Sequence, residues 1–126
     1  MKKVIIAGSF DCLKQKDIHL IKEALKLSVG GELYAIVYGD HQHYKDFGYF
    51  PIQSAFLRTE NLKYFIRSKN IILREDFLKN ISQAYFIGDD DTILFVHPSD
   101  DKDFPGRDDL KEANITIKFI KPYGKA

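Results

Sequence analysis

The residues of this chain that are best suited to chemistry form the stretch Gly8-Ser9-Phe10-Asp11, near the N-terminus. This stretch follows an apolar run at residues 4–7 and precedes a segment with helical periodicity. A glycine lets the backbone approach a ligand closely, and the first turn of a helix offers free N–H groups to an anion. The stretch therefore indicates an anion-binding turn, but only weakly, because many parallel-sheet proteins have a glycine after their first strand.

Such a turn requires a buried strand before it and a helix after it. The apolar run at residues 4–7 is continuous, as is typical of a strand inside a parallel sheet. From Asp17 onward the apolar residues fall at helical spacing, and this pattern stops before Gly30 and Gly31. Comparable patterns predict further strands at residues 33–38, 70–73, 92–96 and 115–120, and further helices at residues 55–68 and 76–85.

Two segments carry no clear period. Residues 41–53 contain Gly48 and Pro51 and are predicted to be a loop, and residues 99–109 are predicted to form an acidic loop or the start of a short helix. Strands that alternate with helices imply right-handed crossovers. We therefore predict a single Rossmann-like α/β domain of three layers, with a mostly parallel five-stranded sheet and helices on both faces. Ligands of such sheets bind at the carboxyl ends of the strands where the strand order reverses, which points to the turn at Gly8.

The composition limits the class of protein. A chain of 126 residues with 44% hydrophobic and 29% charged residues suits one globular domain. The formal net charge of +1 gives no support to general nucleic-acid binding, although it is compatible with a local basic pocket. Cys12 is the single cysteine, so no intrachain disulfide forms, which fits a reducing compartment. No apolar run approaches the ~20 residues that span a bilayer, and we expect a cytoplasmic protein without membrane or nucleic-acid partners.

The first turn resembles that of the nucleotidylyltransferases with the H-x-G-H signature, most closely the small cytidylyltransferases of the glycerol-3-phosphate type. Their first turn reads G-x-F-D-x-x-H-x-G-H and leads into a helix, and this chain supplies Gly8, Phe10 and Asp11. After the second strand the family carries an Asp and then a Lys, which Asp40 and Lys45 match. The resemblance covers most of the chain in the order of its elements, but few of its motif positions.

The resemblance implies the transfer of a nucleotidyl group from a nucleoside triphosphate, with CTP favoured and Mg²⁺ as cofactor, to a phosphorylated small molecule. In that reaction Lys14 and Lys45 would hold phosphates as the catalytic groups, and Asp11 would assist Mg²⁺. The remaining nucleotide contacts implied by the resemblance come from the first turn and from later loops. Together the nucleotide-binding residues are Gly8, Ser9, Phe10, Asp11, Asp40, Arg58 and Asp100.

The signature itself is degenerate. Lys14 stands at the first His of the family, Lys16 at the Gly and Asp17 at the second His. Lys14 keeps a positive charge, but Asp17 places a carboxylate where the phosphates would bind, and two like charges ~4 Å apart repel by about 4 kcal/mol at an effective dielectric constant near 20. A bridging Mg²⁺ would reverse this effect. Asp17 also has a simpler interpretation, because Asp is a favoured N-cap of helices.

The C-terminal part also departs from the family, which closes with a helix that helps to hold the triphosphate. Residues 119–126 reach the comparable point without it. We therefore expect a single cytidylyltransferase-like domain at residues 1–126 that lacks this helix. A homodimer, implied by the resemblance, or another partner subunit would complete the site; otherwise the chain is a piece of a longer protein, or the helix is not needed.

Other interpretations stay open. Asp40, His41 and His43 would form a metal site if their loop curled, and Arg58 would pair with Glu60 instead of a phosphate. A catalytically inactive relative would bind a nucleotide or a protein partner without turnover. In a third interpretation, the chain is an unrelated Rossmann-like domain, and its first turn resembles that of the family by coincidence.

Overall fold

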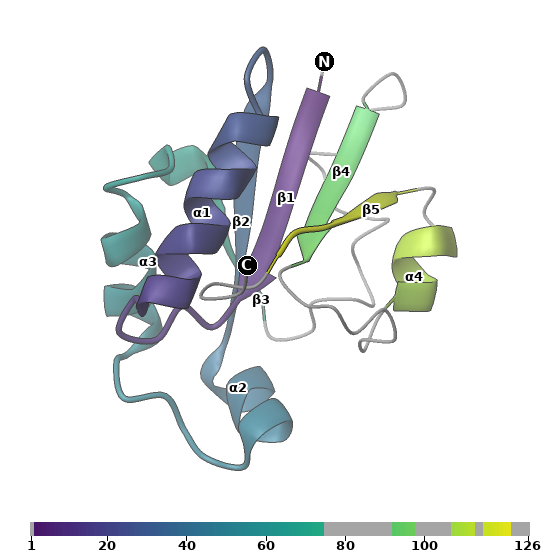
Figure 1. Ribbon diagram of the computed structural model, residues 1–126. Helices are drawn as coiled ribbons and strands as arrows, with labels where there is room; N and C mark the ends of the chain where they lie inside the picture. The colour runs from purple at the N-terminus through teal and green to yellow at the C-terminus, as the bar shows by residue number, and fades with distance from the viewer. Residues whose placement is uncertain (1, 75–91, 98–106, 113–114, 122–126) are drawn as a thin grey trace.

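The computed structural model describes residues 2–74, 92–97, 107–112 and 115–121. Within these ranges Figure 1 shows a central sheet with helices around it. The elements, in chain order, are β1 (Lys2–Gly8), α1 (Gln15–Leu27), β2 (Glu32–Tyr38), α2 (Asp40–Phe47), α3 (Ala55–Leu62), the 3₁₀ helix η1 (Ser68–Asn70), β3 (Ile71–Arg74), β4 (Thr92–His97), α4 (Arg107–Glu112) and β5 (Thr116–Phe119).

The five described strands form one sheet in the order β3-β2-β1-β4-β5, and every neighbouring pair is parallel. The register places Ile5 of β1 opposite Tyr34 of β2 on one side and Phe95 of β4 on the other. The chain moves outward from β1 to β3, crosses back, and then moves outward again through β4 and β5. The strand order therefore reverses beside β1, and the predicted α/β fold with a parallel five-stranded sheet is confirmed.

Alternate residues of the strands feed two separate hydrophobic clusters, one on each face of the sheet. Val4 and Ile6 of β1 pack with Ile21 of α1 and Leu62 of α3. The intervening Ile5 belongs to the second cluster, which contains Leu110 of α4. Helices α1 and α3 thus cover one face and α4 covers the other, so the arrangement has three layers (Figure 1).

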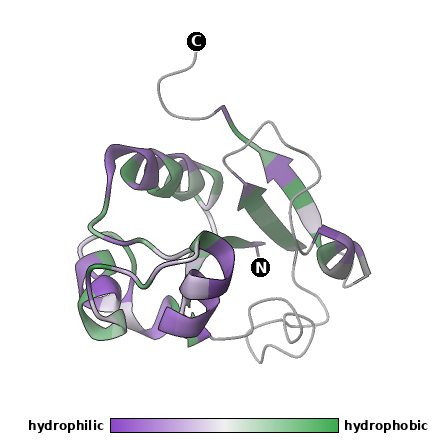
Figure 2. Cartoon of the chain, turned by 90° about the horizontal axis from the view of Figure 1, so that it is seen from below, coloured by the Kyte–Doolittle hydropathy of each residue, from purple (hydrophilic) through white to green (hydrophobic). Residues whose placement is uncertain are grey.

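The hydropathy of the elements agrees with this layering. In Figure 2 the strands are mainly hydrophobic, whereas each helix carries a hydrophilic side. Within the described ranges, no helix combines the length and the apolar character needed to cross a bilayer.

Helix α1 begins earlier than its apolar spacing predicts. The helix starts at Gln15, with Lys14 as its N-cap residue in an extended conformation. Asp17 is therefore the third helical residue and not the N-cap, and its Oδ2 accepts a hydrogen bond from the backbone N–H of Lys14 at 3.0 Å. This contact is half of a capping box, in which an acidic side chain reaches back to the N-cap residue. The predicted N-cap role of Asp17 is therefore wrong, because Lys14 is the N-cap residue and Asp17 supports it from the third helical position.

The predicted loop at residues 41–53 is wrong in its first half, because Asp40–Phe47 forms α2. This short helix is polar and buries a single side chain, that of His43, so no apolar stripe marks it in the sequence. Gly39 precedes it as the N-cap, and Gly48 closes it with a left-handed φ of 79°. The loop prediction failed because backbone capping by two glycines, and not an amphipathic pattern, defines this helix.

The other helix predictions hold in part. The predicted helix at residues 55–68 begins as expected, since Ser54 accepts a hydrogen bond from Leu57 N–H at 3.2 Å, but α3 ends at Leu62. The short helix expected near residues 99–109 is α4, at Arg107–Glu112. The predicted helix at residues 76–85 lies outside the described residues.

Candidate functional site

A pocket of about 420 Å³ lies where β1 ends, at the position at which the strand order reverses. Two parts of the chain line it: residues 7–20, which run from the end of β1 through the turn into the N-terminal half of α1, and residues 43–49, which belong to α2 and the segment after it. The lining residues are Ala7, Gly8, Ser9, Phe10, Asp11, Lys14, Lys16, Asp17, Leu20, His43, Phe47 and Tyr49. The sequence-based prediction of a site at this turn therefore coincides with a real concavity.

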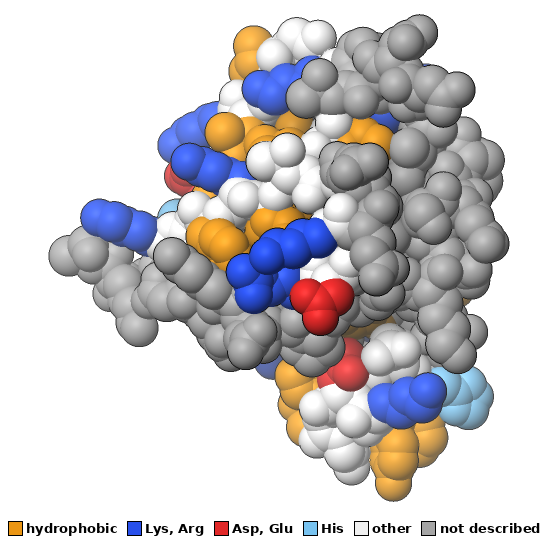
Figure 3. Space-filling model, turned by 90° about the vertical axis from the view of Figure 1, so that its right-hand side faces the viewer, with side chains coloured by type: hydrophobic (Ala, Val, Ile, Leu, Met, Phe, Trp, Pro, Cys, Tyr) orange, Lys and Arg blue, Asp and Glu red, His pale blue; other side chains and the backbone are white. Residues whose placement is uncertain are grey.

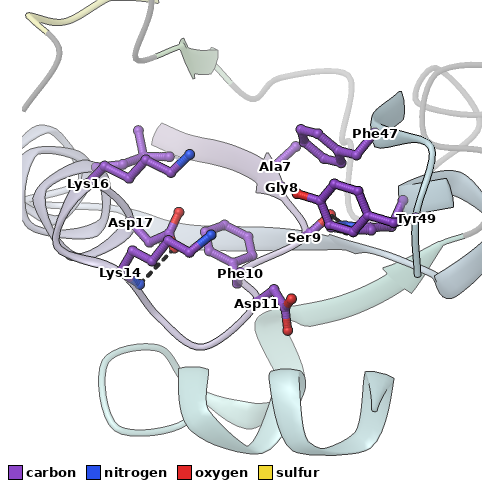
Figure 4. Close-up of a pocket in the computed structure, with 12 residues that line it drawn as sticks. Ala7, Gly8, Ser9, Phe10, Asp11, Lys14, Lys16, Asp17, Phe47 and Tyr49 are labelled. Atoms are coloured by element: carbon purple, nitrogen blue, oxygen red, sulfur yellow. Dashed lines mark hydrogen bonds between the residues drawn. The ribbon is translucent and has the colours of Figure 1, made fainter. Parts of the chain in front are cut away.

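The pocket has a charged side and an aromatic side, as Figure 4 shows. Lys14, the N-cap residue of α1, lies on one side with Lys16 and Asp17 of α1, and Phe47 and Tyr49 lie on the other. Both lysine side chains extend from the region at the start of α1 toward the aromatic side (Figure 4). This arrangement suits a ligand that joins an anionic group to a flat or apolar one, since cations bind anionic oxygen and aromatic rings stack on planar groups.

The turn between β1 and α1 has an unusual backbone. Phe10, Cys12 and Leu13 all have positive φ values, of 52°, 59° and 28°, although none of them is glycine. Residues held in this region cost on the order of 1 kcal/mol each and persist only where the surroundings fix them. One such restraint is the side-chain oxygen of Gln53, which accepts a hydrogen bond from Cys12 N–H at 3.0 Å.

Asp11 provides the second restraint. Its Oδ2 accepts a hydrogen bond from Ile52 N–H at 2.8 Å, and its Oδ1 accepts one from Gln53 N–H at 2.9 Å. Burial by itself would raise the pKa of Asp11, but the hydrogen bonds from Gln53 and Ile52, together with the charge of Arg58, outweigh burial and lower this pKa. Asp11 is therefore an anion that fastens residues 52 and 53 to the first turn.

Arg58 fastens the same turn from behind. Its side chain is fully buried and does not line the pocket. Its nitrogens donate hydrogen bonds to the carbonyl oxygens of Ser9 (2.8 Å), Tyr38 (2.6 Å) and Gln53 (3.2 Å), and to the carboxylate of Asp40 (2.7 Å). The guanidinium thus ties the end of β1 to the end of β2 and to the start of α2. We do not retain Arg58 as a phosphate contact, because every one of its nitrogens donates to a protein oxygen inside the fold.

The remaining predicted residues fall in different places. Asp40 is the partner of Arg58, whereas Glu60, the alternative partner, pairs with Lys63. Lys45 lies exposed on α2, outside the residues that line the pocket, so its phosphate contact stays a prediction. Figure 3 shows α2 and the segment after it projecting from the bottom of the molecule, with hydrophobic and charged side chains side by side. Asp100 lies outside the described residues.

His43 lines the pocket, although the sequence indicated it only as a metal ligand. Only 4% of its surface is exposed, and its Nδ1 lies 2.5 Å from Ser9 Oγ. Its ring contacts the rings of Phe47 and Tyr49, at centroid distances of 4.6 and 5.3 Å. Burial lowers the pKa of His43, an effect that the negative charge of Asp11 partly opposes, and thereby favours the neutral ring.

The metal site considered for Asp40, His41 and His43 does not form. Residues two apart on a helix point about 200° away from each other, so His41 is exposed while His43 is buried. Within the parts of the chain that the structure describes, no three His, Cys, Asp or Glu side chains gather as a metal site. The helical conformation of Asp40–Phe47 separates the two histidines, and no apolar pattern in the sequence indicates this helix.

Comparisons with known proteins bear on the fold. No family model and no curated protein matches the chain. Its structure is similar to the crystal structure of the lipopolysaccharide core biosynthesis protein from Thermoplasma volcanium GSS1, with a TM-score of 0.69 and 23% sequence identity. The similarity covers 100% of this chain and 99% of that chain. At this identity the similarity establishes the Rossmann-like α/β fold of the chain.

Proposed function

We propose that the chain is a nucleotidylyltransferase of the cytidylyltransferase type. It binds a nucleoside triphosphate, with CTP favoured, in the pocket beside Gly8 and transfers the nucleotidyl group to a phosphorylated small molecule. The observation that carries this proposal is the pocket at the end of β1, which combines Lys14 and Lys16 on its charged side with Phe47 and Tyr49 on its aromatic side. Doubly wound sheets bind their ligands at this kind of switch point.

The residues of the charged side act by position and charge. An oxygen of the acceptor phosphate forms a bond to the α-phosphorus, the bond from that phosphorus to its bridging oxygen breaks, and pyrophosphate leaves with the electron pair. Lys14 and Lys16 hold the phosphates and offset the charge that develops on the leaving group, as in other phosphoryl-type transfers. The N-terminus of α1 adds its dipole and its N–H groups on the same side.

Mg²⁺ enters this proposal together with the triphosphate. Asp11 suits a metal poorly, because each of its oxygens already accepts a backbone N–H. Asp17 uses only Oδ2 among the described contacts, so it is the carboxylate of the pocket that could ligate Mg²⁺. Mg²⁺ commonly binds through one or two carboxylates plus substrate phosphates, and it would neutralise phosphate charge in that position.

A second candidate function is nucleotide binding without turnover, and one observation favours it. The positions of the two signature histidines carry Lys14 and Asp17, and both side chains line the pocket. Burial raises the pKa of Asp17, although the N–H of Lys14 opposes this effect. A phosphate beside such a carboxylate is repelled in the absence of a cation, which disfavours a triphosphate in its reactive pose. A homodimer that completes the site stays a prediction under both functions.

One experiment separates the two functions. Pyrophosphate release is measured with CTP or ATP, Mg²⁺ and a panel of phosphosugars, phosphopolyols and phosphocholine. Turnover that Lys14→Ala abolishes and Lys22→Ala leaves intact supports the transferase, because Lys22 is exposed on the same helix but does not line the pocket. Thermal stabilisation by a nucleotide without pyrophosphate release supports binding alone. If no nucleotide produces either pyrophosphate release or thermal stabilisation, both functions are contradicted.

A further inference from the structure

His43 carries an unsatisfied polar atom at the pocket. Its Nε2 is buried and contacts no hydrogen-bonding group among the residues that the structure describes. The residue is 4% exposed and lines the pocket, whereas the two rings against it, Phe47 and Tyr49, are 54% and 56% exposed. A buried donor or acceptor without a partner costs free energy, so its retention in a pocket indicates that a ligand supplies the partner.

The contact with Ser9 determines what kind of partner Nε2 requires. If Nδ1 carried the proton, it would donate to Ser9 Oγ, the Nε2 lone pair would stay buried without a partner, and the serine hydroxyl proton would have no partner among the described contacts. If Nε2 carries the proton, the serine hydroxyl donates to Nδ1 and a single group, Nε2–H, is left without a partner. The second tautomer pairs the serine hydroxyl proton within the protein, so the contact with Ser9 favours the ring with Nε2–H as a donor.

The rest of the pocket indicates which acceptor this donor meets. Lys14 and Lys16 line the same pocket and favour an anionic ligand. A neutral imidazole N–H can add a directed hydrogen bond to such a ligand without the cost of a buried charge. Burial of His43 lowers its pKa and so favours this neutral form.

We propose that His43 is a ligand-binding residue whose Nε2–H donates a hydrogen bond to a phosphate oxygen of the bound molecule, with Ser9 as the residue that positions the ring. This proposal rests on the proposed function, which places a phosphorylated ligand in the pocket. The first turn lacks an imidazole, because Lys14 and Asp17 occupy the positions of the two signature histidines. The proposal assigns an imidazole of α2, that of His43, to the ligand instead. The ligand reaches Nε2 by displacing the exposed ring of Phe47 or Tyr49.

The first test is calorimetric. His43→Phe keeps an aromatic ring against Phe47 and Tyr49 but removes both nitrogens, and His41→Phe is the matched control on the same helix, because His41 is exposed and does not line the pocket. Affinities are measured for CTP with Mg²⁺, for inorganic pyrophosphate and for glycerol 3-phosphate. His43→Phe is expected to weaken binding about 10- to 100-fold, as for loss of a hydrogen bond to a charged group, whereas His41→Phe leaves binding unchanged.

The three probes distinguish the source of the phosphate. Weakening for CTP and pyrophosphate assigns His43 to the nucleotide, and weakening for glycerol 3-phosphate alone assigns it to the acceptor. If the wild-type protein binds these probes and His43→Phe binds them equally well, the role of His43 is refuted while the proposed function stands. If the wild-type protein binds none of them, the proposed function and this inference fail together.

The second test detects the hydrogen bond without relying on a variant. Long-range ¹H–¹⁵N NMR of the imidazole assigns the tautomer of His43 in the wild-type protein. The expected result is a protonated Nε2 and an unprotonated Nδ1 before ligand is added, a change in the Nε2 signal when CTP with Mg²⁺, pyrophosphate or glycerol 3-phosphate binds, and a mixture of tautomers in Ser9→Ala. A proton on Nδ1 in the wild-type protein, or an Nε2 signal that does not respond to a bound probe, overturns the proposal.

Discussion

Nη1 of Arg58 donates a hydrogen bond to the carbonyl oxygen of Ser9 at 2.8 Å, although 49 positions of the chain separate the two residues. The same nitrogen donates to the carbonyl oxygen of Tyr38, at the end of β2. A single buried side chain of α3 therefore holds together the carboxyl ends of two neighbouring strands. The shape of the pocket follows from this contact, because Ser9 lines it.

Replacement of Arg58 tests this relationship. Arg58→Lys keeps the positive charge but loses the planar fork that reaches four oxygens, so buried carbonyl groups lose their donors. We expect a loss of about 3 kcal/mol in the free energy of unfolding, measured by urea denaturation. Arg67→Lys is the control, because the Arg67 side chain is 75% exposed and should cost less than about 0.5 kcal/mol. Equal midpoints for the two variants would contradict the role of Arg58.

Replacement of Asp11 tests in the same way what holds the first turn in place. Asp11→Asn places an amide where two backbone N–H groups require acceptors, so at least one of the contacts to Ile52 and Gln53 is lost. We expect a loss of about 2 kcal/mol in the free energy of unfolding, as for hydrogen bonds to charged groups. Because the pKa of Asp11 is lowered on folding, its contribution is present above the ordinary value of 3.8 and is lost as pH falls through the folded pKa. Asp11→Asn that retained wild-type stability at pH 7 would refute this account.

Asp17 is expected to weaken nucleotide binding when no divalent cation is present. Asp17→Asn removes a carboxylate from the pocket, so the affinity for CTP without Mg²⁺ should rise about 5- to 10-fold, since solvent screens part of the repulsion. With Mg²⁺ the gain should shrink or reverse, because the cation bridges the carboxylate and the phosphates. Isothermal titration calorimetry with and without EDTA measures both affinities. A gain that does not depend on Mg²⁺ would argue against a bridging cation.

The lowered pKa of His43 predicts that the free energy of unfolding depends on pH. Its folded pKa lies below the ordinary value of 6.5, so the unfolded chain takes up the proton more readily. The contribution is complete above pH 6.5 and is lost as pH falls through the folded pKa, with a slope of at most about 1.4 kcal/mol per pH unit. Urea denaturation of wild type and His43→Phe between pH 7.5 and about 4.5 measures the difference. As pH falls below 6.5, the wild type should lose free energy of unfolding relative to His43→Phe, and parallel curves would contradict the assignment.

Much of the fold could be predicted from the sequence, because buried parallel strands appear as short apolar runs. The run at residues 4–7 became the centre of β1, and the apolar spacing after Asp17 became α1. Helix α2 could not be predicted in the same way, because it buries only His43 and is fixed by the backbone at Gly39 and Gly48.

The candidate site shows the same division. Gly8 and Lys14 were predicted from the first turn, and both line the pocket. The structural role of Arg58 could not be predicted, since its four partners come together only after β1, β2 and α2 are packed. The contact of His43 with Ser9 depends on the same packing, and no local pattern in the sequence reports it.

The central claim is that the pocket beside β1 binds a nucleoside triphosphate, and an NMR titration of ¹⁵N-labelled protein with CTP and Mg²⁺ tests it most directly. We predict saturable shifts concentrated at residues 8–17 and at His43, and at least a tenfold loss of affinity in the double variant Lys14→Ala/Lys16→Ala but not in Lys22→Ala. An absence of shifts up to millimolar CTP and ATP, or shifts that leave residues 8–17 unaffected, would contradict the claim.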